Sequence, residues 1–235
     1  MNPLPQMWLT DLRSVSAMKF TLTYDGPLPP SANKPKTKAK WAIRKHFHPQ
    51  LVDLWMHHPT LKTLDLNREY PIRGGMMVQG HHLHPGPLTA PFEVRKDLVG
   101  KQETIDLCAD IAKHGRKFRP LVRETFALHC GLKILFLRRD DPGGVYSGGD
   151  IDGRIKTLLD ALAMPQHAEQ VLTDEDAPST IFCLLEDDSM VSGLQVETER
   201  LLAHKNEGSD YARLVIEVDV RVRMATVYNS YFLGG

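Results

Sequence analysis

The chain has few cysteines, no excess of charge of either sign and no long apolar run. Its three cysteines are widely spaced and form no Cys-x-x-Cys pair, which argues against a disulfide framework and against a zinc ribbon. Lysine plus arginine and aspartate plus glutamate both number 29, so no overall field attracts the protein to nucleic acid. Neither an apolar signal segment nor a membrane-length apolar run is present. These absences predict a globular, cytoplasmic protein with no membrane partner.

Apolar periodicity predicts an α+β fold, a mixed β-sheet with helices packed on it. Residues 128–137 are apolar on both faces, which predicts a central, largely buried strand, whereas residues 214–222 alternate as a half-solvated antiparallel strand does. Further strands are predicted at residues 19–24, 92–96, 181–185 and 190–199, and helices at residues 51–65, 104–114 and 151–162.

The segment from Gly148 to Leu162 contains the largest group of candidate catalytic and metal-binding residues. Two glycines and two carboxylates, Asp150 and Asp152, precede an apolar stripe at helical spacing. Asp152, Lys156 and Asp160 step by four along a different face. In one interpretation this is an ordinary surface helix, with Asp150 as its N-cap and Lys156 paired to the flanking aspartates.

A magnesium site is the alternative interpretation. Asp187 and Asp188 follow the predicted strand at residues 181–185, so carboxylates from a helix start and a strand end would converge. Mg²⁺ prefers hard oxygen ligands and is completed by water and substrate phosphate. We therefore expect Asp150, Asp152 and Asp188 to bind Mg²⁺, or Mn²⁺ in its place, with Asp187 as a less certain fourth ligand. Neighbouring side chains of an extended segment point in opposite directions, which is why Asp187 is the weaker candidate.

Cations cluster between Asp25 and Asp53, where no acid occurs. Such a stretch, with an aromatic residue inside it, suits phosphate contacts and stacking on unpaired bases. The competing interpretation is a solvated surface run, with Trp41 in the core. The candidate nucleic-acid-binding residues are Lys34, Lys36, Lys38, Lys40, Trp41, Arg44 and Lys45. A second, weaker basic cluster contains Lys113, Arg116, Lys117, Arg119 and Arg123.

Two motifs resemble the RusA family of Holliday junction resolvases. The first is Asp150-x-Asp152, followed by Lys156, by Asp160-Ala161-Leu162 and by Asp187-Asp188. The second is Pro29-Pro30-Ser31-Ala32-Asn33, which directly follows a predicted strand and is similar to a turn near the start of RusA-type chains. The resemblance covers roughly residues 19–45 and 128–224.

The resemblance implies a RusA-like fold and a metal-dependent endonuclease that resolves four-way DNA junctions by phosphodiester hydrolysis. Asp150, Asp152, Lys156 and Asp188 are then the expected catalytic residues, with Lys156 placed to reach the scissile phosphate. Asp160 is expected to be structural or to pair with Lys156. Branched DNA is the expected partner, and a homodimer is implied because a four-way junction has two-fold symmetry.

Three features depart from the family pattern. Gly153 stands where an asparagine is usual, the segment between Asp160 and Asp188 is long, and residues 50–116 form a large insertion. We expect one RusA-like domain over residues 1–235, with a loose arm at residues 1–16. A non-cleaving DNA-binding protein on the same scaffold is the alternative. An enzyme holding a metal-bound nucleotide through Asp-x-Asp would need a nucleotide-binding motif, and none is found, so no small-molecule cofactor is expected.

Overall fold

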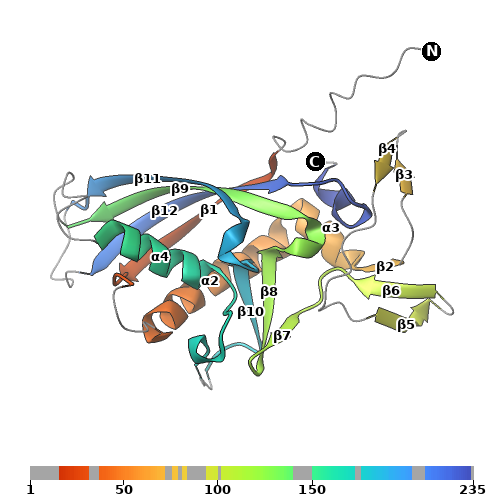
Figure 1. Ribbon diagram of the computed structural model, residues 1–235, viewed down its shortest axis with the longest axis horizontal. Helices are drawn as coiled ribbons and strands as arrows, with labels where there is room; N and C mark the ends of the chain where they lie inside the picture. The colour runs from red at the N-terminus through yellow and green to blue at the C-terminus, as the bar shows by residue number, and fades with distance from the viewer. Residues whose placement is uncertain are drawn as a thin grey trace, which may run out of the picture.

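The α+β architecture expected from the sequence is confirmed by the computed structural model (Figure 1). The structure describes residues 16–31, 37–71, 76–78, 81–83, 94–99, 102–139, 150–172, 176–202 and 210–233. Side chains are not described at residues 71, 76–78, 81–83, 94–99, 102–103, 150 and 227. No helix in the described part of the chain is long and apolar enough to cross a membrane.

A four-stranded mixed sheet forms the main layer. Its strands follow the order β1 (Ser16–Pro27), β12 (Tyr211–Val222), β9 (Leu128–Arg138) and β11 (Val191–Arg200). The β1–β12 and β12–β9 pairs are antiparallel, whereas β9 and β11 are parallel. The alternation of β12 is as predicted, with every second residue from Ala212 to Val222 buried. The prediction of a central β9 is also confirmed.

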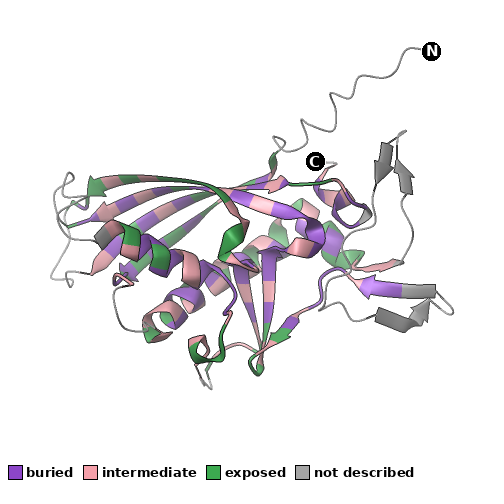
Figure 2. Cartoon of the chain, viewed as in Figure 1, coloured by how far each residue is buried: buried purple, intermediate pink, exposed green. Residues whose placement is uncertain are grey.

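Two helices cover one face of this sheet, here called the inner face (Figures 1 and 2). They are α2 (Thr37–His57) and α4 (Asp150–Leu162), and their buried side chains belong to the same apolar cluster as those of the sheet. The bounds of α4 agree with the prediction. The helix predicted at residues 51–65 is confirmed in type, but α2 begins at Thr37, and a separate helix α3 follows at Pro59–Leu66.

Short strands build the rest of the molecule. One three-stranded sheet has the order β10 (Thr180–Leu185), β8 (Arg116–Val122) and β7 (Ile111–Lys113). A second contains β2 (Glu69–Pro71), β6 (Gln102–Asp106) and β5 (Val94–Val99), and β3 (Met76–Val78) pairs with β4 (His81–Leu83). Leu61, Leu64, Ile105 and Leu107, all inside the insertion, belong to the same buried cluster as the main sheet.

The predicted helix at residues 104–114 is wrong, because this segment contains the end of β6, a turn and β7. The Asp106 side chain accepts the backbone N–H of Cys108 at 2.8 Å and two bonds from Arg68, and this ends β6. Backbone with positive φ at His114 and Gly115 then turns β7 into β8. Local polar contacts and strand pairing therefore outweigh the weak helical spacing.

Arg44 joins α2 to the C-terminal end of α4. Arg44 is 2% exposed, and its guanidinium donates to the carbonyl oxygens of Asp160 at 2.8 Å and Ala163 at 2.9 Å. These carbonyls lie in the last turn and just beyond it, where a helix lacks partners for its C=O groups. A cation at that end also complements the helix dipole. Arg44 therefore acts as a side-chain cap of α4.

Replacing Arg44 with methionine is expected to lower the free energy of unfolding by about 2–4 kcal/mol, because two buried carbonyls lose their donor. The exposed Lys38, also on α2, provides the control, and Lys38→Met should change the free energy by less than about 0.5 kcal/mol. Urea unfolding measures both. Equal stability of the two variants would contradict the capping role.

Candidate metal and nucleic-acid site

The Pro29-Pro30-Ser31 turn packs against the first turn of α4, although about 120 residues separate them. The backbone N–H of Ser31 donates to the carbonyl oxygen of Gly153 at 3.1 Å. Two further bonds hold the approach to this turn. Leu28 N–H donates to the Asp210 carbonyl at 2.8 Å, and the Tyr24 hydroxyl donates to the Pro27 carbonyl at 2.6 Å. Burial and the neighbouring Asp25 raise the pKa of Tyr24 to about 12, so this donor keeps its proton.

Gly153 permits this close approach. A Cβ at residue 153 would lie 3.2 Å from the backbone nitrogen of Ser31 and 3.3 Å from the Cβ of Pro30. The Pro-Pro-Ser turn therefore occupies the space that a side chain at residue 153 would need.

The charged face of α4 is open to solvent where the helix begins (Figure 2). Asp152 and Lys156 are both exposed and stand one helical turn apart, on the same side of α4. Asp150 is the first residue of α4, and its side chain lies outside the described part. Two carboxylates one residue apart, with an ammonium one turn later, suit a hard cation and a phosphate. This face and the Pro-Pro-Ser turn form the candidate site.

Asp187 and Asp188 are near the opposite end of α4. The strand before them, β10, ends beside the end of α4, where Met164 N–H donates to the Leu185 carbonyl at 2.8 Å. The distance from Asp152 to Leu162 along the helix is roughly 15 Å, at 1.5 Å per residue. One chain thus does not bring Asp152 and Asp188 together.

The two neighbouring carboxylates have different surroundings. Asp187 caps the short helix η4 (Asp188–Met190), because its Oδ1 accepts the N–H of Ser189 at 3.0 Å. These bonds from Ser189 hold the pKa of Asp187 below its ordinary value. Asp188 is exposed. Asp187 therefore has a structural role at this turn.

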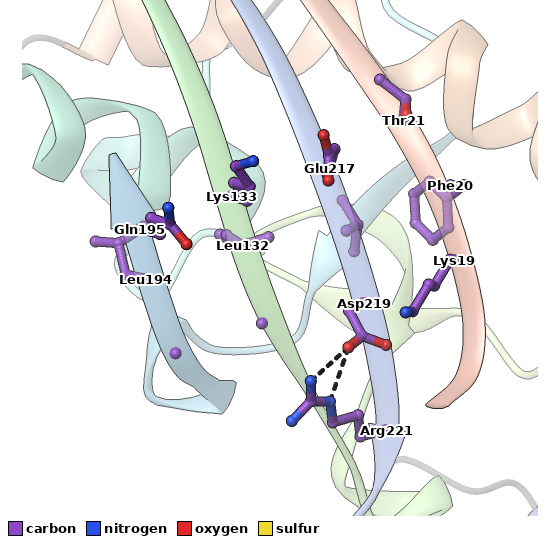
Figure 3. A pocket seen from close by; sticks show the side chains of 13 residues that line it. Lys19, Phe20, Thr21, Leu132, Lys133, Leu194, Gln195, Glu217, Asp219 and Arg221 are labelled. Carbon is purple, nitrogen blue, oxygen red and sulfur yellow. Dashed lines mark hydrogen bonds and ion pairs between the residues drawn. The ribbon is translucent and has the colours of Figure 1, made fainter. Parts of the chain in front are cut away.

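Among the side chains that the structure describes, no three His, Cys, Asp or Glu residues converge to hold a metal ion. Asp150 is outside that set. A shallow hollow of about 600 Å³ lies on the sheet face opposite α4, the outer face, and is lined by none of the predicted site residues (Figure 3).

The prediction that Trp41 and Arg44 contact DNA is wrong. Trp41 is 3% exposed and packs among Phe118, Met164 and Ile181. The guanidinium groups of Arg44 and Arg116 lie 5.7 and 5.4 Å from the centre of its ring. Trp41 and Arg44 are on the buried side of helix α2. A run of basic residues in the sequence does not show which side chains face the core.

The other basic residues divide into three groups. Lys38 is exposed and Lys45 is partly exposed, whereas Lys40 forms a 2.5 Å ion pair with Asp160. Lys34 and Lys36 lie outside the described residues. In the second basic cluster, Arg123 is buried, and Arg119 bonds to Asp110 at 2.7 Å.

Two contacts at α4 were not anticipated. The partner of Asp160 is Lys40 from α2 rather than Lys156 from its own helix. Arg154, 5% exposed, approaches Asp210 at 3.6 Å and ties the start of α4 to the start of β12. Both join segments far apart in the sequence, so no local signal could have indicated them.

Comparison of the chain with models of protein families, with curated proteins and with solved structures gave no match.

Gly153→Val is expected to lower the free energy of unfolding by about 1–3 kcal/mol, because the new side chain meets the Ser31 backbone. Gly131 provides the control, since a Cβ there meets nothing within 4 Å. Thermal unfolding of both variants measures the difference. A Gly153→Val protein as stable as Gly131→Val would show that the turn does not press on α4.

Asp187→Ala is expected to destabilise the protein by about 0.5 kcal/mol at pH 7, the low end for a cap because solvent screens this carboxylate. The pKa of Asp187 is lower in the folded protein than its ordinary value of 3.8. Its contribution to the free energy of unfolding is therefore complete above pH 3.8 and is lost as the pH falls through the folded pKa. The stability difference from wild type should therefore shrink below pH 3.8. Unfolding at several pH values tests this, with Asp187→Asn as the control that keeps an acceptor.

Proposed function

We propose that the protein is a metal-dependent endonuclease that resolves four-way DNA junctions, as its resemblance to the RusA family implies. One observation carries the proposal. The described part of the first stretch, residues 29–31, lies against the start of α4, which belongs to the second stretch, through the bond from Ser31 to Gly153. Two unrelated stretches of sequence need not lie together in the fold. Here the turn lies against the helix start, and Asp152 and Lys156 are exposed beside it.

The residues at the helix start fit a divalent cation by their chemistry. Asp150 and Asp152 would supply the hard oxygen ligands that Mg²⁺ or Mn²⁺ prefers. When bound, such an ion polarises the phosphate and lowers the pKa of a water molecule. Lys156, one turn further along, places an ammonium where negative charge develops on the phosphate during hydrolysis.

A second subunit completes this site in the proposal. Asp152 and Asp188 are at opposite ends of α4, so one chain cannot present both to one phosphate. A two-fold dimer can bring the start of α4 in one subunit to Asp188 of the partner subunit. Such a dimer has two equivalent sites, as paired cuts across a symmetric junction require.

Mixing two inactive variants tests this arrangement. We expect Asp152→Asn and Asp188→Asn each to lose cleavage of a synthetic four-way junction in Mg²⁺ by at least about 100-fold. After subunit exchange, a mixed dimer holds one site with both changes and one intact site. A 1:1 mixture should therefore regain about a quarter of wild-type activity, because half of the dimers are mixed and each has one of two sites.

The control is Asp53→Asn, which removes an exposed carboxylate of α2 and should leave cleavage unchanged. If the mixture stays inactive although subunits exchange, the two carboxylates do not come from different chains. If either single variant cleaves as wild type does, its carboxylate is not part of the site.

A second candidate is a junction-binding protein that does not cleave. It stays open because Gly153 stands where the RusA family usually has an asparagine. Both candidates require junction binding, to which the exposed Lys38 and the partly exposed Lys45 would contribute phosphate contacts. Tight binding by wild type with no cleavage in either Mg²⁺ or Mn²⁺ would favour this second function.

A further inference from the structure

The two edges of the four-stranded sheet differ in whether another group already covers them. At the β1 edge, the amide of Gln50 from α2 takes the place of a neighbouring strand. Its Oε1 accepts the N–H of Thr23 at 2.9 Å, and its Nε2 donates to the carbonyl of the same residue at 2.8 Å. Such a cap protects an edge strand from pairing with another chain.

The β11 edge has no such cover among the described strands, because β11 is the last strand of its sheet. Most of its residues are exposed. Leu194 is 46% exposed, and Leu202, just after the strand, is 77% exposed. Among the described residues, these are two of the five large apolar side chains that are exposed.

The hydrogen bonding of β11 shows which backbone groups face outward. Leu201 N–H donates to the Arg138 carbonyl of β9 at 2.6 Å, so the odd-numbered residues of this strand direct their backbone toward β9. Backbone direction alternates along a strand. The N–H and C=O groups of Leu194, Val196 and Thr198 therefore point away from the sheet.

We propose that β11 pairs antiparallel with β11 of a second copy of the chain, with Val196 on the two-fold axis. In this register, Gln195 stands opposite Glu197 of the partner subunit, and an amide can donate to a carboxylate. The exposed Leu194 stands opposite Thr198 of the partner subunit. Shifting the strands so that Val196 meets Thr198 would place two Glu197 carboxylates face to face, which is unfavourable.

The side chains on the outer face support this register (Figure 3). Gln195 lies on β11 beside Lys133 of β9, and its amide already donates to Glu197 Oε1 at 2.8 Å within one strand. In the dimer, the Gln195 amide of each subunit can donate instead to the Glu197 carboxylate of the partner subunit. Continuing the sheet through β11 would join two four-stranded sheets into one of eight strands.

This interface also supplies what the proposed function lacks, and this step rests on that function. Because β9 and β11 are parallel, β11 ends at the edge of the sheet where the chain leaves β9 toward α4. In an antiparallel pair, the end of β11 lies next to the start of the partner's strand. Asp188, three residues before β11 begins, would then approach the α4 start of the other subunit.

A cysteine at Val196 tests the register. Two Val196→Cys residues on the axis would have Cα atoms roughly 5.5 Å apart, which a disulfide spans. The native Cys108, Cys130 and Cys183 are all buried and do not compete. Mild oxidation should cross-link most of the protein as a dimer. Glu199→Cys is the control, because its two copies would lie roughly 20 Å apart and should not cross-link.

A proline at the same position tests the pairing itself. Val196→Pro removes an N–H that points away from β9, so the fold should persist while dimerisation weakens by about tenfold or more. Light scattering over a concentration series measures the dimer, and circular dichroism reports whether the chain is folded.

The outcomes separate this inference from the proposed function. If the wild-type protein cleaves junctions but the Val196→Cys variant does not cross-link, the β11 interface is wrong and the proposed nuclease activity is retained. Efficient and specific cross-linking without cleavage would support the interface and overturn the nuclease. Equal cross-linking of Val196→Cys and Glu199→Cys, or a Val196→Pro protein that is folded and dimerises as wild type does, would also overturn the interface.

Discussion

Burial of the apolar side of α4 against the inner face of the sheet is the constraint on which the rest of the structure depends. Ile155, Leu158 and Leu162 are nearly inaccessible to solvent and belong to one cluster with the strands. A helix with one apolar stripe has only one orientation that removes this stripe from water. That orientation leaves Asp152 and Lys156 exposed. The hydrophobic packing therefore determines where the candidate chemistry can lie.

Polar contacts then determine how α4 is held at its two ends. The Ser31 bond to Gly153 and the approach of Arg154 to Asp210 fix the beginning, and Arg44 with Lys40 fixes the end. Arg44 is costly to bury, and its contacts with backbone carbonyls offset this cost. Burial lowers the pKa of Arg44, an effect that neighbouring Cys183 and Asp160 oppose. The basic residues of α2 thus serve partly as internal structure rather than as a DNA-binding surface.

Packing within one chain keeps Asp152 and Asp188 at opposite ends of α4. Asp152 is in the helix that follows β9 in the chain, whereas Asp188 comes after β10 and just before β11. The end of β10 lies beside the end of α4, not beside its start. In the function that we propose, a two-fold symmetric assembly would bring the two carboxylates together without moving either element. Among the described strands β11 has no further neighbour, whereas Gln50 caps the β1 edge, so the two edges of the sheet differ.

The sequence by itself determined the elements whose side chains repeat with a strict period. The alternation of β12 and the apolar stripe of α4 were readable because burial on one side imposes a period of two or 3.6 residues. The candidate residues at the helix start were also readable, since Asp150, Asp152 and Lys156 are close in the chain. Only the tertiary structure decided the burial of Trp41 and Arg44, the partner of Asp160 and the distance from Asp152 to Asp188. The region at residues 104–114 likewise became strands through pairing with distant segments. These outcomes depend on contacts between residues far apart in the chain, and local periodicity carries no information about them.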